Sequence, residues 1–143
     1  MKVSQLKSVI ATGATEIVRL QSRINETFRY RDASPRQYEA WKCACDEFHS
    51  RYAALAFPGG YEGAIERMLA GDALVIEAAM CFLEERPYFF RSGYMFSNIL
   101  RKVKRAALSP DQAKRLAVVA ERQALWRDKK SHKLAASPNH TTP

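Results

Sequence analysis

Four residues with metal-binding side chains lie close together in the sequence: Cys43, Cys45, Asp46 and His49. On a helix, Cys45 and His49 would share a face, whereas Cys43 would point about 200° away from Cys45. Structural zinc needs four ligands and catalytic zinc three, so two on one face are too few. Cys81 lies in an apolar stretch and is expected in the core. We therefore expect neither a metal site nor a cofactor.

Groups that could catalyse a reaction are isolated from one another in the sequence. Glu77 and Glu84 are seven residues apart and would share a helix face. They could act as an acid–base pair, form the solvated edge of the helix or bind arginines. His49 falls on the same predicted helix as its nearest thiol, not across a pocket from it. The glycine-rich residues 59–63 lack the spacing of a phosphate-binding loop. We expect a protein that is not an enzyme, and an enzyme of unrecognised type stays an alternative.

Aromatic residues are concentrated in one short stretch, where five of the nine residues from Tyr88 to Phe96 are aromatic. Neighbours on a helix are about 100° apart, so these rings cannot all face one core. Either the stretch from Pro87 to Gly93 is a corner whose rings fill the core from two sides, or some rings are exposed. Exposed aromatic and arginine side chains are the favoured anchors of interfaces.

Basic residues follow this stretch. Asn98, Arg101, Lys102 and Arg105 are spaced i, i+3, i+4 and i+7, which predicts one helix face. Such a face could be an ordinary solvated surface, or it could bind an acidic protein surface or phosphates. Our candidate partner-binding residues are Tyr88, Arg91, Tyr94, Arg101, Lys102 and Arg105.

Charge is unevenly distributed along the 143 residues. The net charge is +3 over residues 1–33, zero over 34–57, −4 over 58–86 and +9 over 87–143, which sums to the formal +8. The excess therefore lies in the C-terminal part. No zinc-finger spacing or convincing helix-turn-helix pattern accompanies it, so nucleic-acid binding is the second function class and not the first.

The elements that must position these residues are helices. Alanine occurs 21 times, whereas glycine and proline occur six times each and lie at plausible boundaries. We predict an all-α protein, an irregular bundle of about five helices or a short α-solenoid-like stack of helical hairpins. The predicted helical segments are 4–30, 35–56, a short 61–70, 73–86, 95–108 and 110–127.

Two similar motifs predict helix starts: Ser34-Pro35-Arg36-Gln37 and Ser109-Pro110-Asp111-Gln112. In each, serine is the N-cap, proline takes the first helical position, and glutamine three residues on can reach back to the cap. The segment 73–86 is apolar nearly all round and is predicted to be the central helix.

The first helix carries an apolar seam spaced alternately four and three residues apart until its last step. Its members are Leu6, Ile10, Gly13, Ile17, Leu20, Ile24 and Phe28. This pattern is typical of a coiled coil, and a dimer through Leu6, Ile10, Ile17, Leu20 and Ile24 is one interpretation. The other is packing within the chain's own bundle, which we favour and which predicts a monomer. Gly13 would allow another backbone to come close.

The length of the chain fits one domain, predicted over residues 1–127, followed by a flexible basic and polar tail over 128–143. No stretch is long and apolar enough to span a bilayer, and residues 8–15 are a poor signal-peptide core. Three cysteines without framework spacing are consistent with reduced thiols, so we expect a cytoplasmic protein. The function that we expect is a helical protein-interaction module, of the adaptor, inhibitor or toxin-immunity type, whose partner has an acidic surface.

Overall fold

The computed structural model describes residues 1–135 of the chain, with side chains described through residue 132. The described part is all-helical, as predicted, with six helices instead of about five. The helices are α1 (Val3–Phe28), α2 (Pro35–Ala56), α3 (Ala64–Leu69), α4 (Ala73–Glu85), α5 (Ser92–Val103) and α6 (Pro110–Ala135). None of these helices is both long and apolar enough to cross a membrane.

The chain divides into two compact units, residues 1–107 and the part from residue 108 onward. The first unit contains α1 to α5, and the second contains α6. The single domain predicted over residues 1–127 stays a prediction.

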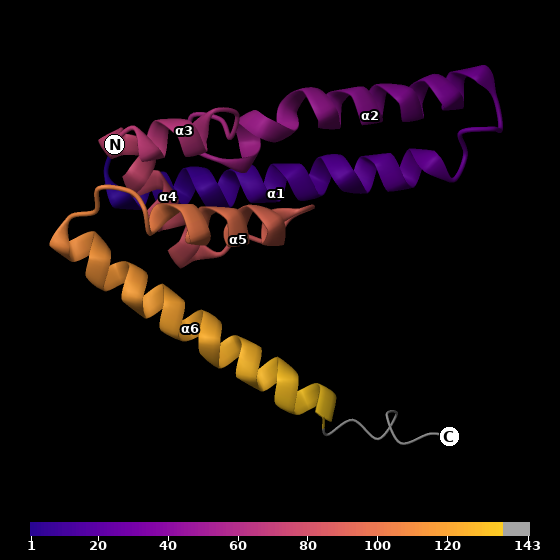
Figure 1. The fold of residues 1–143 in the computed structure, drawn as a ribbon. Coiled ribbons are helices and arrows are strands. Elements are labelled where there is room, and N and C mark those ends of the chain that lie inside the picture. Colours follow the sequence, from indigo (N-terminus) through magenta and orange to yellow (C-terminus); the bar gives the residue numbers. More distant parts are fainter. Residues whose placement is uncertain (136–143) are drawn as a thin grey trace. The chain divides into compact units, whose positions relative to one another are not determined.

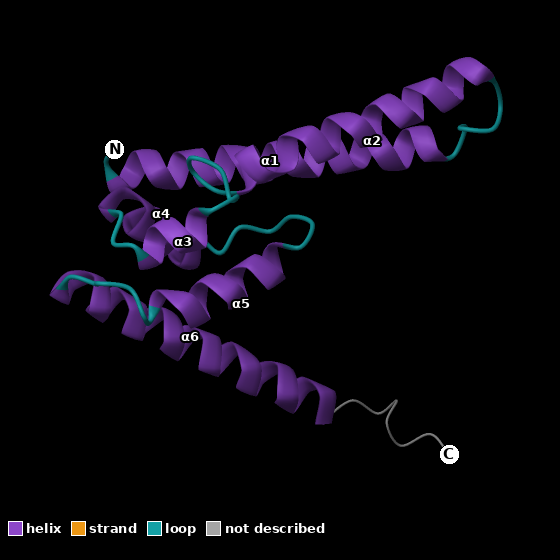
Figure 2. Ribbon diagram, turned by 45° about the horizontal axis from the view of Figure 1, so that its top comes forward, coloured by secondary structure: helices purple, strands orange, loops and turns teal. Residues whose placement is uncertain are grey.

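Helices α1 and α2 form a long antiparallel hairpin, whose loop end extends beyond α3, α4 and α5 (Figures 1 and 2). At Gly13 the two backbones are so close that a Cβ atom would overlap the carbonyl oxygen of Leu55. Glycine removes the side chain that would keep the helices apart. The prediction that Gly13 admits another backbone is confirmed.

The apolar seam of α1 lies inside the chain, where α1 contacts α2 and α4. Leu6, Ile10, Ile17 and Leu20 are buried, whereas Ile24 is half-buried and Phe28 is 48% exposed. The seam is therefore covered by other helices of the same chain over most of its length. Its last member lies at the exposed loop end of the hairpin.

Helix α4 is the most deeply buried helix of the first unit. It contacts α1, α3 and α5, and its buried residues are Val75, Ile76, Ala78, Ala79, Met80, Cys81, Phe82 and Leu83. Leu74 is the exception, because it lies in the first turn and is 52% exposed. The prediction of a central helix, apolar nearly all round, is confirmed for the rest of the helix.

Both serine caps form as predicted. The backbone N–H groups of Gln37 and Gln112 donate to the hydroxyls of Ser34 (3.2 Å) and Ser109 (3.1 Å). The Gln112 side chain also accepts from the backbone N–H of Ser109 at 3.0 Å, which completes a capping box. In α2 the glutamine side chain instead accepts from the Ser34 hydroxyl. These contacts satisfy N–H groups that a helix start otherwise leaves without a partner.

The other ends of the predicted helices differ from those observed. Helix α3 is shorter than the predicted 61–70, and its last residue, Leu69, is 37% exposed. Helix α6 continues to Ala135 and does not end near Arg127. Residues 128–135 contain neither glycine nor proline, so nothing in them stops the helix. The predicted tail is therefore helical over 128–135, and its remainder, 136–143, lies outside the described residues. Trp126 of α6 is 47% exposed.

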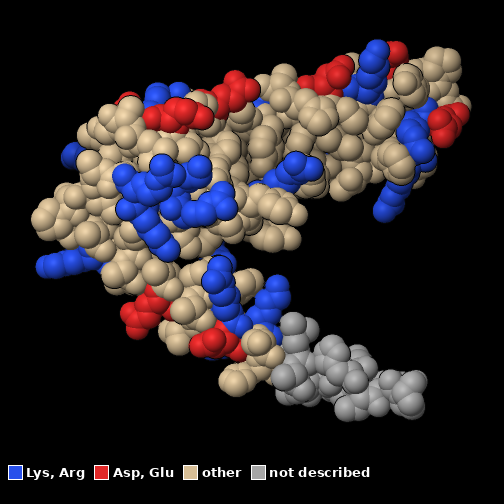
Figure 3. Space-filling model, viewed as in Figure 1, with Lys and Arg blue, Asp and Glu red and all other residues tan. Residues whose placement is uncertain are grey.

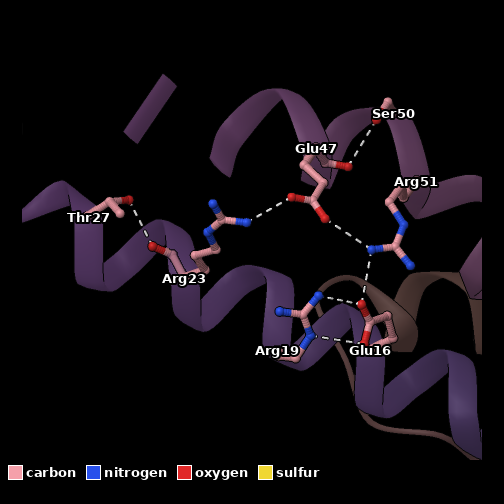
Figure 4. A network of polar contacts seen from close by, with 7 residues as sticks. All are labelled: Glu16, Arg19, Arg23, Thr27, Glu47, Ser50 and Arg51. Carbon is pink, nitrogen blue, oxygen red and sulfur yellow. Dashed lines mark hydrogen bonds and ion pairs between the residues drawn. The ribbon is translucent and has the colours of Figure 1, made fainter. Parts of the chain in front are cut away.

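A network of charged side chains joins α1 to α2 (Figure 4). Arg19 donates to both carboxylate oxygens of Glu16, at 2.6 and 3.0 Å. Arg51 bridges the two helices, with Nη1 3.0 Å from Glu16 Oε1 and 3.1 Å from Glu47 Oε1. Arg23 donates to the other oxygen of Glu47 at 2.9 Å. The arginines on this side of the hairpin therefore have acidic partners.

Candidate partner-binding surface

The connection between α4 and α5 is a short loop that begins and ends with an arginine in the left-handed backbone region (Figure 2). Arg86 has φ 47° and ends α4, and Arg91 has φ 66° and precedes the first residue of α5. No other described residue except glycine has a positive φ. Arginine is unfavourable in this conformation by roughly 1–2 kcal/mol, so the surrounding contacts must hold the loop in place.

Three hydrogen bonds hold this loop. The backbone N–H of Phe89 donates to the hydroxyl of Ser92 at 3.1 Å, and the N–H of Ser92 donates back to the Phe89 carbonyl at 2.9 Å. Tyr52 of α2 donates its hydroxyl to the Phe90 carbonyl at 2.6 Å. Burial raises the pKa of the Tyr52 hydroxyl, and the nearby charge of Arg91 opposes part of that rise. The hydroxyl therefore stays protonated and remains a donor at neutral pH.

These contacts decide which aromatic rings reach solvent. Phe89 and Phe96 are buried, each 5% exposed, so the connection is a corner that fills the core from two sides. Tyr88 is 89% exposed, Tyr94 79% and Phe90 43%. The two interpretations of the aromatic stretch therefore each describe part of it. The side chains at the surface are those of Tyr88, Tyr94, Phe90 and Arg91. The Cζ atom of Arg91 lies 5.4 Å from the Phe90 ring centre.

Helix α5 begins and ends earlier than the predicted 95–108. It begins at Ser92, because the turn through Phe89 and Ser92 starts the helix before Met95. It ends at Val103, after which Arg105 donates its backbone N–H to Lys102 three residues back. Arg105 therefore lies in a turn beyond the helix. The predicted face of Asn98, Arg101, Lys102 and Arg105 is helical only as far as Lys102.

Helix α5 has a buried inner face and a more exposed outer face. Phe96, Ile99 and Val103 are buried, and Leu100 is half-buried. On the outer side, Asn98 donates to the Tyr61 hydroxyl at 3.0 Å and accepts from Arg101 at 3.1 Å. The Asn98 side chain therefore has partners within the chain.

Tyr88, Arg91 and Tyr94 line one shallow pocket of about 660 Å³ together with Val18 and Gln21 of α1. We call it the α1-side pocket. Arg101, Lys102 and Arg105 are not among its lining residues. They follow Tyr94 along the chain, and Lys102, the last of them within the helix, lies about 12 Å further along α5 at the helical rise per residue. The structure thus brings three of the six candidate residues together and places the other three toward the end of the helix.

A second shallow pocket of about 540 Å³ lies on the other side of the loop. Phe90 and Arg91 line it as well, with Phe48, His49, Tyr52, Ala53 and Glu62. We call it the α2-side pocket. Sequence reasoning did not foresee it, because Arg91 and His49 are 42 positions apart and no local pattern joins them. A prediction that α2 packs near the aromatic stretch would have been needed to expect His49 and Arg91 at one pocket.

The cations of this surface lack acidic partners, unlike the arginines of the hairpin. No acidic residue occurs between Glu85 and Asp111. Within the part that the structure describes, Arg91, Arg101, Lys102, Lys104 and Arg105 form no ion pair. Figure 3 shows Lys and Arg side chains gathered over the region of α5. Among the described residues, no ion pair therefore neutralises these five cations.

The other candidate groups are dispersed. Through residue 132, no three His, Cys, Asp or Glu side chains lie close enough to hold a metal ion. Cys43 is exposed, Cys45 half-buried and Cys81 buried, and all three are free thiols. The carboxylate of Glu84 lies 3.8 Å from Lys7 Nζ of α1, so a lysine of α1 is one of its partners.

Comparisons with protein-family models, with curated proteins and with solved structures find no match for this chain.

Proposed function

We propose that the protein is a non-enzymatic helical interaction module that binds an acidic surface of a partner protein. It does so through the aromatic–basic surface, by which we mean Tyr88, Arg91, Tyr94, Arg101, Lys102 and Arg105. The observation that carries this proposal is the contrast between two sets of cations. Arg19, Arg23 and Arg51 of the hairpin have carboxylate partners, whereas the cations of this surface form no ion pair with any residue that the structure describes.

The aromatic side chains support a protein partner. Tyrosine and arginine are enriched among the residues that contribute most to protein interfaces, and tyrosine combines an apolar ring with a polar tip. Tyr88 and Tyr94 are among the most exposed large side chains of the described chain, and Arg91 lies between them in sequence. An acidic partner would gain both ring contacts and charge complementarity, and the positive field would speed the encounter.

Nucleic-acid binding is the second candidate. The acid-free stretch between Glu85 and Asp111 carries six basic residues, and unpaired bases could stack on the exposed rings of Tyr88 and Tyr94. Such binding would not depend on one partner. It would weaken steeply with salt, with a slope set by the number of phosphates neutralised.

The experiment that tests the proposal compares the wild-type protein with Arg101→Glu/Arg105→Glu as bait in a native lysate, with and without nuclease. The recovered partner is then purified and its affinity measured by calorimetry at several salt concentrations. We expect one protein to be retained after nuclease treatment, and the double variant to bind it at least about tenfold more weakly. Arg29→Glu/Arg36→Glu is the matched control, because both arginines are exposed and the change in charge is the same.

Two results would contradict the proposal. If the folded double variant keeps its partner at wild-type affinity, the basic residues are only a solvated face. The second contradicting result has two parts: nuclease treatment removes everything that the bait retains, and the slope of log affinity against log salt concentration for an oligonucleotide is smaller by about two in the double variant. Together they would show that the ligand is nucleic acid.

A further inference from the structure

Phe90 and Arg91 form a ridge between two pockets. The α1-side pocket lies between this ridge and Val18 and Gln21 of α1, and the α2-side pocket lies between the ridge and α2. The ridge is held in place from α2 by the hydrogen bond from the Tyr52 hydroxyl to the Phe90 carbonyl. A ligand that crosses the ridge would therefore meet Arg91 from both sides.

The two pockets differ in charge. Arg91 is the only charged residue that lines the α1-side pocket, whose other lining groups are tyrosines, small polar residues and apolar residues. Arg91 forms no ion pair with any described residue. This pocket suits an anionic group, because a guanidinium binds a carboxylate through two parallel hydrogen bonds.

The α2-side pocket suits a different group. The rings of Phe48, Tyr52 and Phe90 supply an apolar wall, and the carboxylate of Glu62 is also at the pocket. An acidic side chain there would meet Glu62, a like charge. The ring centre of Phe48 lies 5.6 Å from that of Tyr52 and 6.0 Å from that of Phe90, so the three rings form one continuous wall. An apolar or aromatic side chain can pack against this wall.

We propose that the ligand of this ridge is a short segment of the partner protein that combines an acidic with an aromatic side chain. The acidic side chain binds Arg91 in the α1-side pocket, and the aromatic side chain occupies the α2-side pocket. This inference rests on the proposed function and specifies the partner's chemistry at Arg91, apart from the contribution of Arg101 and Arg105.

The test is a titration of the full-length, ¹⁵N-labelled protein with a short synthetic peptide in which two glutamates lie next to a phenylalanine. We expect the amide signals of residues around both pockets, such as Gln21 and Ala53, to shift as the peptide is added. A peptide with lysines in place of the glutamates should cause no shifts. A peptide with alanine in place of the phenylalanine should shift only signals around the α1-side pocket.

Two variants locate the contacts. Arg91→Gly removes the guanidinium and suits the positive φ at this position, so the protein should stay folded while its affinity for the peptide falls about tenfold or more. Ala53→Trp fills the α2-side pocket. This variant should bind the peptide with phenylalanine no more tightly than the peptide with alanine in its place. Ala54→Trp is the matched control on the same helix, because Ala54 is exposed and does not line that pocket.

The proposal is wrong if no signal shifts, if the lysine peptide binds equally well, or if Arg91→Gly binds the peptide like the wild type. It is also wrong if only signals around Arg101 and Arg105 respond, although the proposed function would then stand. An oligothymidylate that shifts the pocket signals when the peptide does not would show that the occupant is single-stranded nucleic acid.

Discussion

Gly13 sets the distance between the two longest helices of the first unit. A Cβ atom at this position would overlap the carbonyl oxygen of Leu55, and it would lie 3.2 Å from the carbonyl carbon. Neither atom belongs to a flexible side chain, so the overlap can be relieved only by moving the α2 backbone. The residue is therefore required by packing and not by a turn.

We expect the overlap in Gly13→Ala to cost about 3 kcal/mol, the upper end of the usual cost of an overpacked core, because the added Cβ meets backbone and not a flexible side chain. Alanine stabilises a helix by up to about 1 kcal/mol relative to glycine. The expected net destabilisation is the overpacking cost minus this gain in helix propensity. Gly93→Ala in α5 is the control, because no atom lies within 4 Å of its added Cβ and the same substitution should be neutral or stabilising. Urea unfolding of both variants measures the difference, and equal stability of Gly13→Ala and wild type would contradict the close approach.

The residue scale is also where sequence reasoning about the site reached its limit. The density of rings from Tyr88 to Phe96 predicted either a corner whose rings fill the core or a set of exposed rings, and it did not indicate which rings would be exposed. The choice depends on the positive φ of Arg91 and on the hydrogen bond from Tyr52. Tyr52 is 38 residues from Phe90, and arginine in the left-handed region has no sequence signal.

At the scale of elements, the hairpin of α1 and α2 is joined by charge as well as by apolar packing. The paired hydrogen bonds from Arg19, supported by another from Arg51, lower the pKa of Glu16 from 4.5 to about 2. Between these two values the folded protein binds fewer protons at Glu16 than the unfolded chain does. The contribution of Glu16 to stability is therefore fully present above pH 4.5 and is lost as the pH falls toward 2.

Glu16→Gln should remove this part of the pH dependence. We expect the melting temperature of the variant to fall less steeply than that of the wild type from pH 4.5 to about 2. Glu26→Gln, an exposed position on the same helix, serves as the control and should follow the wild-type curve. Parallel curves for Glu16→Gln and the wild type would mean that the network in Figure 4 does not persist in solution.

Element boundaries were predictable where a side chain defines them. The serines of the two Ser-Pro-x-Gln motifs predicted the starts of α2 and α6 to the residue, because each cap is a local hydrogen bond. The start of α5 was not predictable, because it depends on the turn through Phe89 and Ser92 and on the backbone of Arg91. Similarly, α6 ends later than its composition predicts, because polar residues without glycine or proline do not stop a helix.

At the scale of the whole molecule, composition predicted the helical class, the apolar spacing predicted the buried positions of α1, and the nearly continuous apolar sequence of 73–86 predicted the burial of α4. The spacing did not determine what covers the α1 seam, because a coiled coil and an intramolecular bundle need the same spacing. In the structure α2 and α4 contact α1, and Ile17 is fully buried in the middle of the seam.

This packing leads to a prediction about assembly, in which the wild-type protein sediments as a monomer and Ile17→Asp unfolds it. An aspartate at this position would be a buried charge without a partner, which costs roughly 3–5 kcal/mol or more. That is a large part of the 5–15 kcal/mol by which domains are typically stable. Val18→Asp is the matched control, because Val18 is the next residue and is 42% exposed.

Analytical ultracentrifugation and circular dichroism of the three proteins distinguish the alternatives. Loss of cooperative unfolding in Ile17→Asp, with a folded monomer for the wild type and Val18→Asp, would agree with a seam covered within the chain. A wild-type dimer that Ile17→Asp converts to a folded monomer would instead show that the seam joins two copies. In that case α2 and α4 could not cover Ile17 in solution as they do here, because a seam covered within one chain has no surface left for a second copy.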